Sequence, residues 1–196
     1  MLYQKQPPGI CARHTNEHIK GITMFIGHLP AGYLITCGLF KPLPLPKNAA
    51  RRCILAGLTG AIAPDFDLIW CYLVDHGQHH HHLYPTHWPL IWFSALSLLL
   101  LWAGLVKNKY PVLLCVVFCV NGIVHLLLDS LVGDIGWLMP FDNTLFALAH
   151  VPAQYHPWWL NFFLHWSFML EMALVVAAIW LWRRRRKASL IEAPVE

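Results

Sequence analysis

The stretch NGIVHLLLDSLV, residues 121–132, carries a histidine and an aspartate within one of the most apolar parts of the chain. Asn121, His125 and Asp129 are spaced i, i+4 and i+8, so a helix through this stretch has all three on one face. An imidazole nitrogen and a carboxylate oxygen on one face can bind the same metal ion, with Asn121 beneath them as a hydrogen-bonding partner. A His–Asp hydrogen bond that ties two helices together explains the pair equally well at this point.

The composition around this stretch is typical of a membrane protein. Of the 196 residues, 57% are hydrophobic and 12% are charged, and the mean hydropathy is +0.48. Five apolar stretches are each close to the roughly 20 residues with which a helix crosses about 30 Å of hydrocarbon. We therefore expect an all-α, polytopic membrane bundle of about five transmembrane helices. The stretches are residues 22–40, 53–73, 88–106, 111–132 and 159–182.

The distribution of lysine and arginine predicts the orientation of the bundle. With five spans, one side of the membrane holds 3 of the 14 basic residues and the other holds the remaining 11. The positive-inside rule then places the N-terminus outside and the C-terminus in the cytoplasm. We expect a polar tail (1–21), one five-helix transmembrane domain (22–182) and a basic cytoplasmic tail (183–196).

The basic run WRRRRK at residues 182–187 is best explained as a stop-transfer anchor in contact with the anionic lipid of the bilayer. No other basic cluster supports a nucleic-acid partner. The acids and histidines follow the opposite rule: none of the 13 histidines and only Glu192 and Glu196 among the ten acids lie in a cytoplasmic segment. Because a charge at a helix centre costs about 2.5–3.5 kcal/mol, those kept in the spans imply partners, water or metal.

The second apolar stretch ends in APDFDLIW, where a proline interrupts the helix. Pro64 has no N–H and disfavours helix at Ala63, so the backbone should be kinked or unwound there. On a regular helix Asp65 and Asp67 point about 200° apart. Both can face one site only if the helix breaks. Otherwise, one of them can bind metal while the other orients a ligand. Capping of a helix end is the structural alternative.

The loop DHGQHHHHLYPTHWPL joins the second and third stretches. Thr86 is a plausible N-cap with Pro89 in the first turn, which puts His87 at a helix start where the chain re-enters the membrane. His82 can fold back towards the same point. The preceding histidines, 79–81, are better explained as a solvated loop with adventitious metal affinity.

Two further ionisable residues lie in apolar stretches. His28, in IGHLPAGYL, is by itself better explained by a helix–helix hydrogen bond. Glu171, in HWSFMLEMAL, can be a ligand, a base or an anchor for a ligand. The full set of mixed nitrogen and oxygen donors suits two divalent ions, whereas one catalytic zinc takes about three protein ligands. It comprises His28, Asp65, Asp67, His82, His87, His125, Asp129 and Glu171.

Several of these motifs occur in an order that resembles a known family. They are GH at 27–28, PDFD at 64–67, HxxxTH at 82–87 and HxxxD at 125–129, followed by Gly136 and Pro140. Over about residues 27–141 the chain resembles the bacterial LexA-regulated, membrane-bound metal-dependent hydrolase family. The resemblance implies metal positions at His28, Asp65, Asp67, His82, His87, His125 and Asp129.

The chain departs from that family where the family commonly has HRGxTHS. Here residues 82–88 are HLYPTHW, without the arginine that can hold a substrate phosphate or carboxylate. The order of histidines and aspartates also looks like that of zinc-dependent phospholipase C and the single-strand nuclease group. That more distant likeness implies a phosphoester substrate.

These observations predict a metal-dependent hydrolase of the bacterial cytoplasmic (inner) membrane, with its site facing the periplasm or outside. Its cofactor is expected to be two Zn²⁺, with Mn²⁺ or Mg²⁺ as alternatives, and its substrate a lipid or lipid-linked phosphoester. Asp67 or Glu171 is the expected base. Two other functions fit the ionisable residues: a divalent-cation transporter, and a haem or quinone protein using paired histidines such as His28, His125 or His165.

Overall fold

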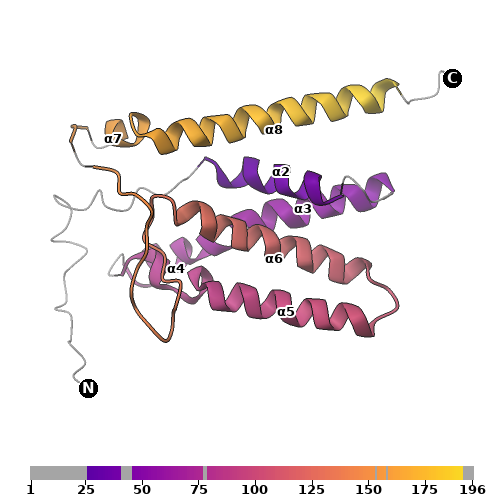
Figure 1. The fold of residues 1–196 in the computed structure, drawn as a ribbon, viewed down its shortest axis with the longest axis horizontal. Helices are drawn as coiled ribbons and strands as arrows, with labels where there is room; N and C mark the ends of the chain where they lie inside the picture. Colours follow the sequence, from indigo (N-terminus) through magenta and orange to yellow (C-terminus); the bar gives the residue numbers. More distant parts are fainter. Residues whose placement is uncertain (1–25, 41–45, 77–78, 153, 158, 192–196) are drawn as a thin grey trace.

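The structure of the chain is a computed structural model. It describes residues 26–40, 46–76, 79–152, 154–157 and 159–191. The predicted tail 1–21 and residues 192–196 lie outside the described residues. Within the described residues all regular structure is helical, apart from one antiparallel bridge between Ile135 and Phe146. The longer helices lie side by side as a bundle (Figure 1), which confirms the all-α membrane fold.

The main helices are α2 (His28–Phe40), α3 (Lys47–Ile62), α4 (Asp67–Leu73), α5 (Pro89–Leu105), α6 (Tyr110–Asp129) and α8 (Trp166–Ile191). The short helix α7 (Trp159–Phe163) precedes α8, and there are three 3-10 turns, η1 (Pro64–Phe66), η2 (His81–Leu83) and η3 (Pro85–His87).

Among the described residues, fewer helices have the length and composition of a membrane span than the five that we expected. Helix α6 and the Trp166–Lys187 part of α8 are long and apolar enough to cross a membrane alone, with mean hydropathies of 2.4 and 1.4. Helices α3 and α4 pass as a third span only as a pair, bent by 55°. Helices α5 and α2 have 17 and 13 residues, which at about 1.5 Å per residue fall short of the hydrocarbon core.

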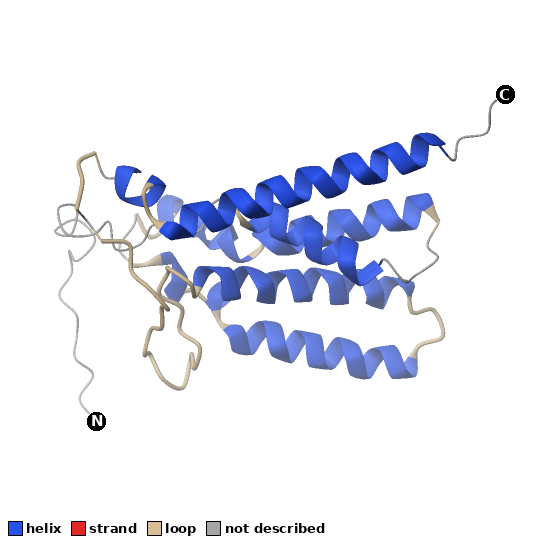
Figure 2. Ribbon diagram, turned by 45° about the horizontal axis from the view of Figure 1, so that its top comes forward, coloured by secondary structure: helices blue, strands red, loops and turns tan. Residues whose placement is uncertain are grey.

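The second span breaks at Pro64, as predicted. Helix α3 ends at Ile62, η1 begins at Pro64, and α4 continues from Asp67 at the new angle. The cause is that proline donates no hydrogen bond and its ring clashes with the preceding turn. The longer loops gather at one end of the bundle (Figure 2), and α4, which follows the break, lies at that end (Figure 1).

Close contacts between helices hold the centre of the bundle. A Cβ at Gly60 of α3 would collide with the backbone of Phe118 on α6, so only glycine lets these helices approach so closely. On the same face of α6, the Asn121 amide donates to Thr36 Oγ1 of α2 at 3.1 Å and to the Val117 carbonyl at 2.8 Å. Asn121 therefore ties α6 to α2. Among the described residues it makes no hydrogen bond to His125, contrary to our expectation.

Helix α8 lies along α2 at the edge of the bundle (Figure 1). Only 11% of its most apolar window is buried, against 39% in α6. The two ends of the bundle also differ in charge. One end carries the start of α3 with Arg51 and Arg52 and the basic run of α8, and the opposite end carries the loops with most of the described acids and histidines.

Candidate metal centre

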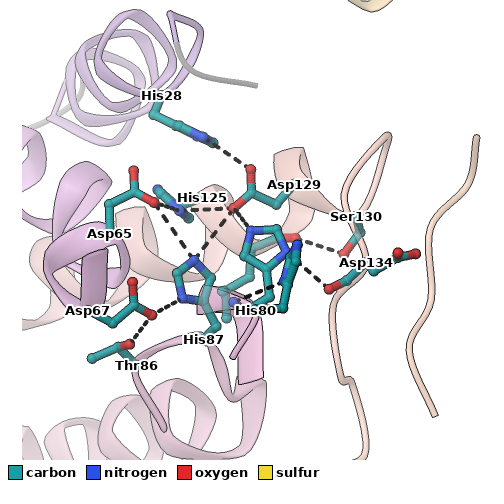
Figure 3. Close-up of polar contacts among 12 residues, drawn as sticks. His28, Asp65, Asp67, His80, Thr86, His87, His125, Asp129, Ser130 and Asp134 are labelled. Carbon is teal, nitrogen blue, oxygen red and sulfur yellow. Dashed lines mark hydrogen bonds and ion pairs between the residues drawn. The ribbon is translucent and has the colours of Figure 1, made fainter. Parts of the chain in front are cut away.

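Six ionisable side chains from distant parts of the chain converge at the loop end of the bundle (Figure 3). They come from the start of α2, the three 3-10 turns and the last turns of α6. Five of them are almost completely buried, and the side chain of Asp65 is 27% exposed. They are His28, Asp65, His82, His87, His125 and Asp129.

Asp129, the last residue of α6, lies at the centre of the cluster. Its Oδ2 is 3.0 Å from His125 Nε2. The same oxygen is 3.7 Å from His82 Nε2 and 3.8 Å from His87 Nε2. Its Oδ1 is 3.2 Å from Nε2 of His28. One carboxylate therefore reaches four histidines on four elements, and the His125–Asp129 pair of the helix face forms part of a larger site.

Backbone carbonyl groups determine which nitrogen of two histidines faces the site. His125 Nδ1 lies 2.7 Å from the carbonyl oxygen of Ala61, and His82 Nδ1 lies 3.0 Å from that of Asp134. A carbonyl oxygen only accepts, so each ring carries a proton on Nδ1. The neutral ring then presents the lone pair of Nε2 to the cluster, which is the form that binds metal.

A carboxylate determines which nitrogen of His87 faces the site. Asp67 Oδ2 accepts from His87 Nδ1 at 2.5 Å and from Thr86 Oγ1 at 2.7 Å. Thr86 is therefore not the N-cap of α5 that we expected, and the N-cap residue Trp88 makes no side-chain cap. The break at Pro64 points Asp65 Oδ1 towards His125 and His87, at 3.5 and 3.8 Å from their Nε2 atoms. Asp65 thus faces the site, while Asp67 holds the His87 ring.

Several of these buried atoms lack a hydrogen-bond partner among the described residues. They include Nε2 of His82, His87 and His125, together with Asp129 Oδ1. Leaving a buried polar atom unpaired costs about 1–3 kcal/mol. The nitrogen lone pairs and the carboxylate oxygens that face them also repel one another. A cation between them would remove both this repulsion and the cost of leaving the atoms unpaired. The donor set of imidazole and carboxylate fits a divalent transition metal such as zinc.

The donor atoms form three overlapping groups, each with its atoms within 4.8 Å of one another. Two of the groups share no residue and could each hold one of two neighbouring ions. The groups are His28 with Asp65 and His125; His87 with His125 and Asp129; and His81 with His82 and His87.

His81 is the candidate ligand that sequence reasoning missed. We had assigned it to a solvated run, but η2 turns it inward beside His82 and His87. Burial, with nearby His87 and His80, lowers the pKa of His81 to about 4, and burial also lowers the pKa of His82. Both rings are then neutral at pH 7, the state that metal binding needs. His79 is mostly exposed and pairs with Asp75 at 2.7 Å.

Comparison with known proteins gives this bundle a family. Residues 23–191 match the YdjM inner membrane protein family. The chain belongs to this family. No curated protein and no solved structure matches the chain. The description of this family confirms the predicted location in the inner membrane. Its description specifies neither a metal nor a reaction, so the hydrolase activity remains a prediction.

Glu171 of this YdjM-family chain is buried on α8, beside the start of α2. Its Oε2 accepts from the backbone N–H of Ile26 at 2.8 Å. It belongs to none of the three donor groups. Of the three roles that the sequence allowed, this contact favours an anchor, because Glu171 holds the segment that leads into His28. His165 lies apart from the cluster and pairs with Ser167 at 2.9 Å.

Proposed function

We propose that this YdjM-family chain is a metal-dependent hydrolase of the inner membrane. The observation that carries the proposal is the convergence of the Nε2 lone pairs of His82, His87 and His125 beside two carboxylates in a buried site. None of the described donor groups contains cysteine, which closed structural zinc sites usually use. The partial exposure of Asp65 leaves one side of the cluster open, as a catalytic site requires.

The donor groups suggest how two ions would be held. His28, Asp65 and His125 would hold one ion, and His81, His82 and His87 would hold the second, because these two groups share no ligand. Asp129 lies between them, with Oδ1 near His28 and Oδ2 near His82. Zinc is the first expectation because it favours imidazole with carboxylate, and Mn²⁺ or Mg²⁺ is the alternative. A divalent ion supplies hydroxide near neutral pH and stabilises negative charge on a phosphoryl oxygen.

The chain's own residues would position the ligands and move protons. Asp67 and Thr86 hold the His87 ring in one orientation. Asp67 and Glu171 remain the two candidates for the base. Each keeps one buried carboxylate oxygen, Asp67 Oδ1 and Glu171 Oε1, without a hydrogen-bond partner among the described residues. An oxygen of this kind can accept a proton when it is within reach of water or substrate.

The surroundings of Asp65 support a lipid phosphoester as the substrate. The neighbouring residues of η1 and α4, Phe66, Ile69 and Trp70, are 56–60% exposed and apolar. In an inner membrane protein such a surface contacts lipid. The positive-inside rule puts the basic end in the cytoplasm and the cluster near the outer leaflet. A lipid or lipid-linked headgroup can then reach the open side of the site without leaving the bilayer.

Two observations disfavour the other functions. A transporter needs polar groups along a path through the bundle. Below Asn121 and Thr36, the contact between α3 and α6 is a buried apolar cluster built on Cys53 and Val117. A haem between paired histidines needs space, whereas the rings of His28 and His125 stack with centroids 3.9 Å apart.

The decisive experiment is metal analysis of the purified protein together with hydrolysis of phospholipids and a soluble phosphodiester. We expect stoichiometric divalent metal in the wild type and loss of both metal and hydrolysis in His125→Ala. The matched control is His156→Ala, which removes an exposed histidine outside the cluster. Size-exclusion chromatography of each variant separates loss of metal from loss of fold.

Each outcome has a distinct meaning. A wild type without stoichiometric metal would overturn the proposal. Metal without hydrolysis, combined with metal flux into proteoliposomes, would support the transporter. An absorption band of haem in the purified protein would support the third function.

A further inference from the structure

A groove runs between α8 and the pair formed by α2 and α3. Its apolar part, about 370 Å³, is lined by residues that include Leu29, Leu58 and Ile179. A second part, about 540 Å³, shares Tyr33 and Trp182 with the first, so the two are continuous. None of the cluster residues lines either part.

The medium around the bundle suggests what fills the apolar part. Helix α8 lies at the edge of the bundle (Figure 1), and Ile179 and Trp182 are 45% and 49% exposed. In an inner membrane protein this surface faces hydrocarbon, where water is absent and acyl chains are the only abundant occupant. A groove of this size falls within the range of about 300–1,000 Å³ that is typical of ligand sites.

The second part of the groove is basic and chemically suited to phosphate. Arg51 of α3 meets Arg185 and Arg186 of α8 there. The described carboxylates lie towards the opposite end of the bundle, so the mouth of the groove is strongly positive. Guanidinium groups bind phosphate oxygens in pairs of hydrogen bonds.

Two contacts hold these arginines at the groove. Arg185 donates to Cys37 Sγ of α2 at 2.5 Å. The Arg186 guanidinium lies over the Trp182 ring, 5.5 Å from its centroid. These contacts reduce the entropy that the side chains lose on binding a ligand. The Arg184 guanidinium makes a similar contact with Trp180, at 5.4 Å, so the contact that is particular to the groove is the one between Arg185 and Cys37.

We propose that this groove binds one anionic phospholipid from the leaflet at the basic end. Its phosphate would lie against Arg51, Arg185 and Arg186, and one acyl chain would extend past Tyr33 and Trp182 into the apolar part. The lipid would fill the space between α8 and the rest of the bundle, where α8 buries little of its own surface. This site is separate from the proposed hydrolase centre and does not depend on it.

The first test compares two lipids with identical acyl chains, phosphatidylglycerol and phosphatidylcholine, by native mass spectrometry of the full chain in a neutral detergent. We expect one tightly bound phosphatidylglycerol in the wild type. In the triple variant Arg51→Gln, Arg185→Gln, Arg186→Gln, phosphatidylglycerol affinity should fall about tenfold or more, because each basic residue near a lipid surface contributes appreciably to attraction.

The matched control also removes three charges, all from the basic run of α8 outside the groove lining. In Arg183→Gln, Arg184→Gln, Lys187→Gln we expect phosphatidylglycerol affinity to change less than about threefold. An equal loss in both triple variants would mean attraction by net charge alone and would overturn the proposed site.

A second variant tests the groove itself. Ala178→Trp fills the apolar part and leaves every charge in place. We expect it to lose the tight phosphatidylglycerol, and unchanged binding would overturn the proposal. Should size-exclusion chromatography show that this variant is misfolded, Ala178→Leu makes the same test with a smaller side chain. The comparison of the two triple variants does not depend on either substitution at Ala178.

Discussion

Three of the four cluster histidines present Nε2 because the other nitrogen of each ring is bonded to a fixed acceptor. For His125 and His82 that acceptor is a backbone carbonyl, and for His87 it is the side chain of Asp67. Only Asp67 can be replaced by substitution, because the other two acceptors belong to the backbone. The orientation of ligands by such outer contacts commonly determines metal affinity.

Asp67→Asn tests this outer contact. The amide keeps the shape of the carboxylate but removes its charge, so it holds the His87 ring less firmly in the tautomer with a free Nε2. We expect metal affinity to fall about 10–100-fold, measured by competition with a chelator. Asp142→Asn is the control, because Asp142 bonds only to nearby Thr144 in an exposed turn. Equal affinity of Asp67→Asn and wild type would contradict the role given to Asp67.

The histidine run offers a matched pair of substitutions. His81 lies within ligand distance of His82 and His87, whereas His79 is exposed and pairs with Asp75. We expect His81→Ala to lower the metal content or affinity of the purified protein. His79→Ala should leave both unchanged, as measured by elemental analysis after dialysis against the metal. The reverse result would show that His81 is not a ligand.

At the scale of elements, the break at Pro64 and the close contact of α3 with α6 position the site. The break separates the directions of Asp65 and Asp67, and the contact brings the Ala61 carbonyl to His125. The sequence predicted the first feature, because proline acts locally. It did not predict the second, because the partner of Gly60 lies on another helix.

Gly60→Ala tests the contact between α3 and α6. Its Cβ would meet the backbone of Phe118, which cannot rotate away, so we expect a loss of about 1–3 kcal/mol in unfolding free energy. The control is Gly104→Ala on α5, where a Cβ meets nothing within 4 Å. That change should be neutral or slightly stabilising, because alanine favours helix. Thermal unfolding in detergent measures both, and equal midpoints would contradict the close contact.

For the whole molecule, the separation of charge between the two ends predicts the orientation in the membrane. The basic end should lie in the cytoplasm and the histidine cluster on the periplasmic side. Two or three helices satisfy the length and composition of a span, and α2 and α5 are shorter. Sidedness therefore needs a direct measurement.

Reporter fusions supply that measurement. Alkaline phosphatase inserted after Asp142, in the exposed loop next to the cluster, should be active because that enzyme folds in the periplasm. Green fluorescent protein fused after Glu196 should fluoresce because it folds in the cytoplasm. Inactive phosphatase in the loop would place the cluster on the cytoplasmic side and remove the outer leaflet from the proposed function.

The sequence by itself determined the helical membrane class, the break at Pro64 and most of the residues that meet at the site. These features follow from composition, local backbone chemistry and the period of one helix. Only the tertiary structure decided that Asp67 holds His87, that Asn121 bonds Thr36 and that His81 turns inward. The physical reason is that these contacts join residues on different elements, whose relative placement depends on packing across the whole bundle.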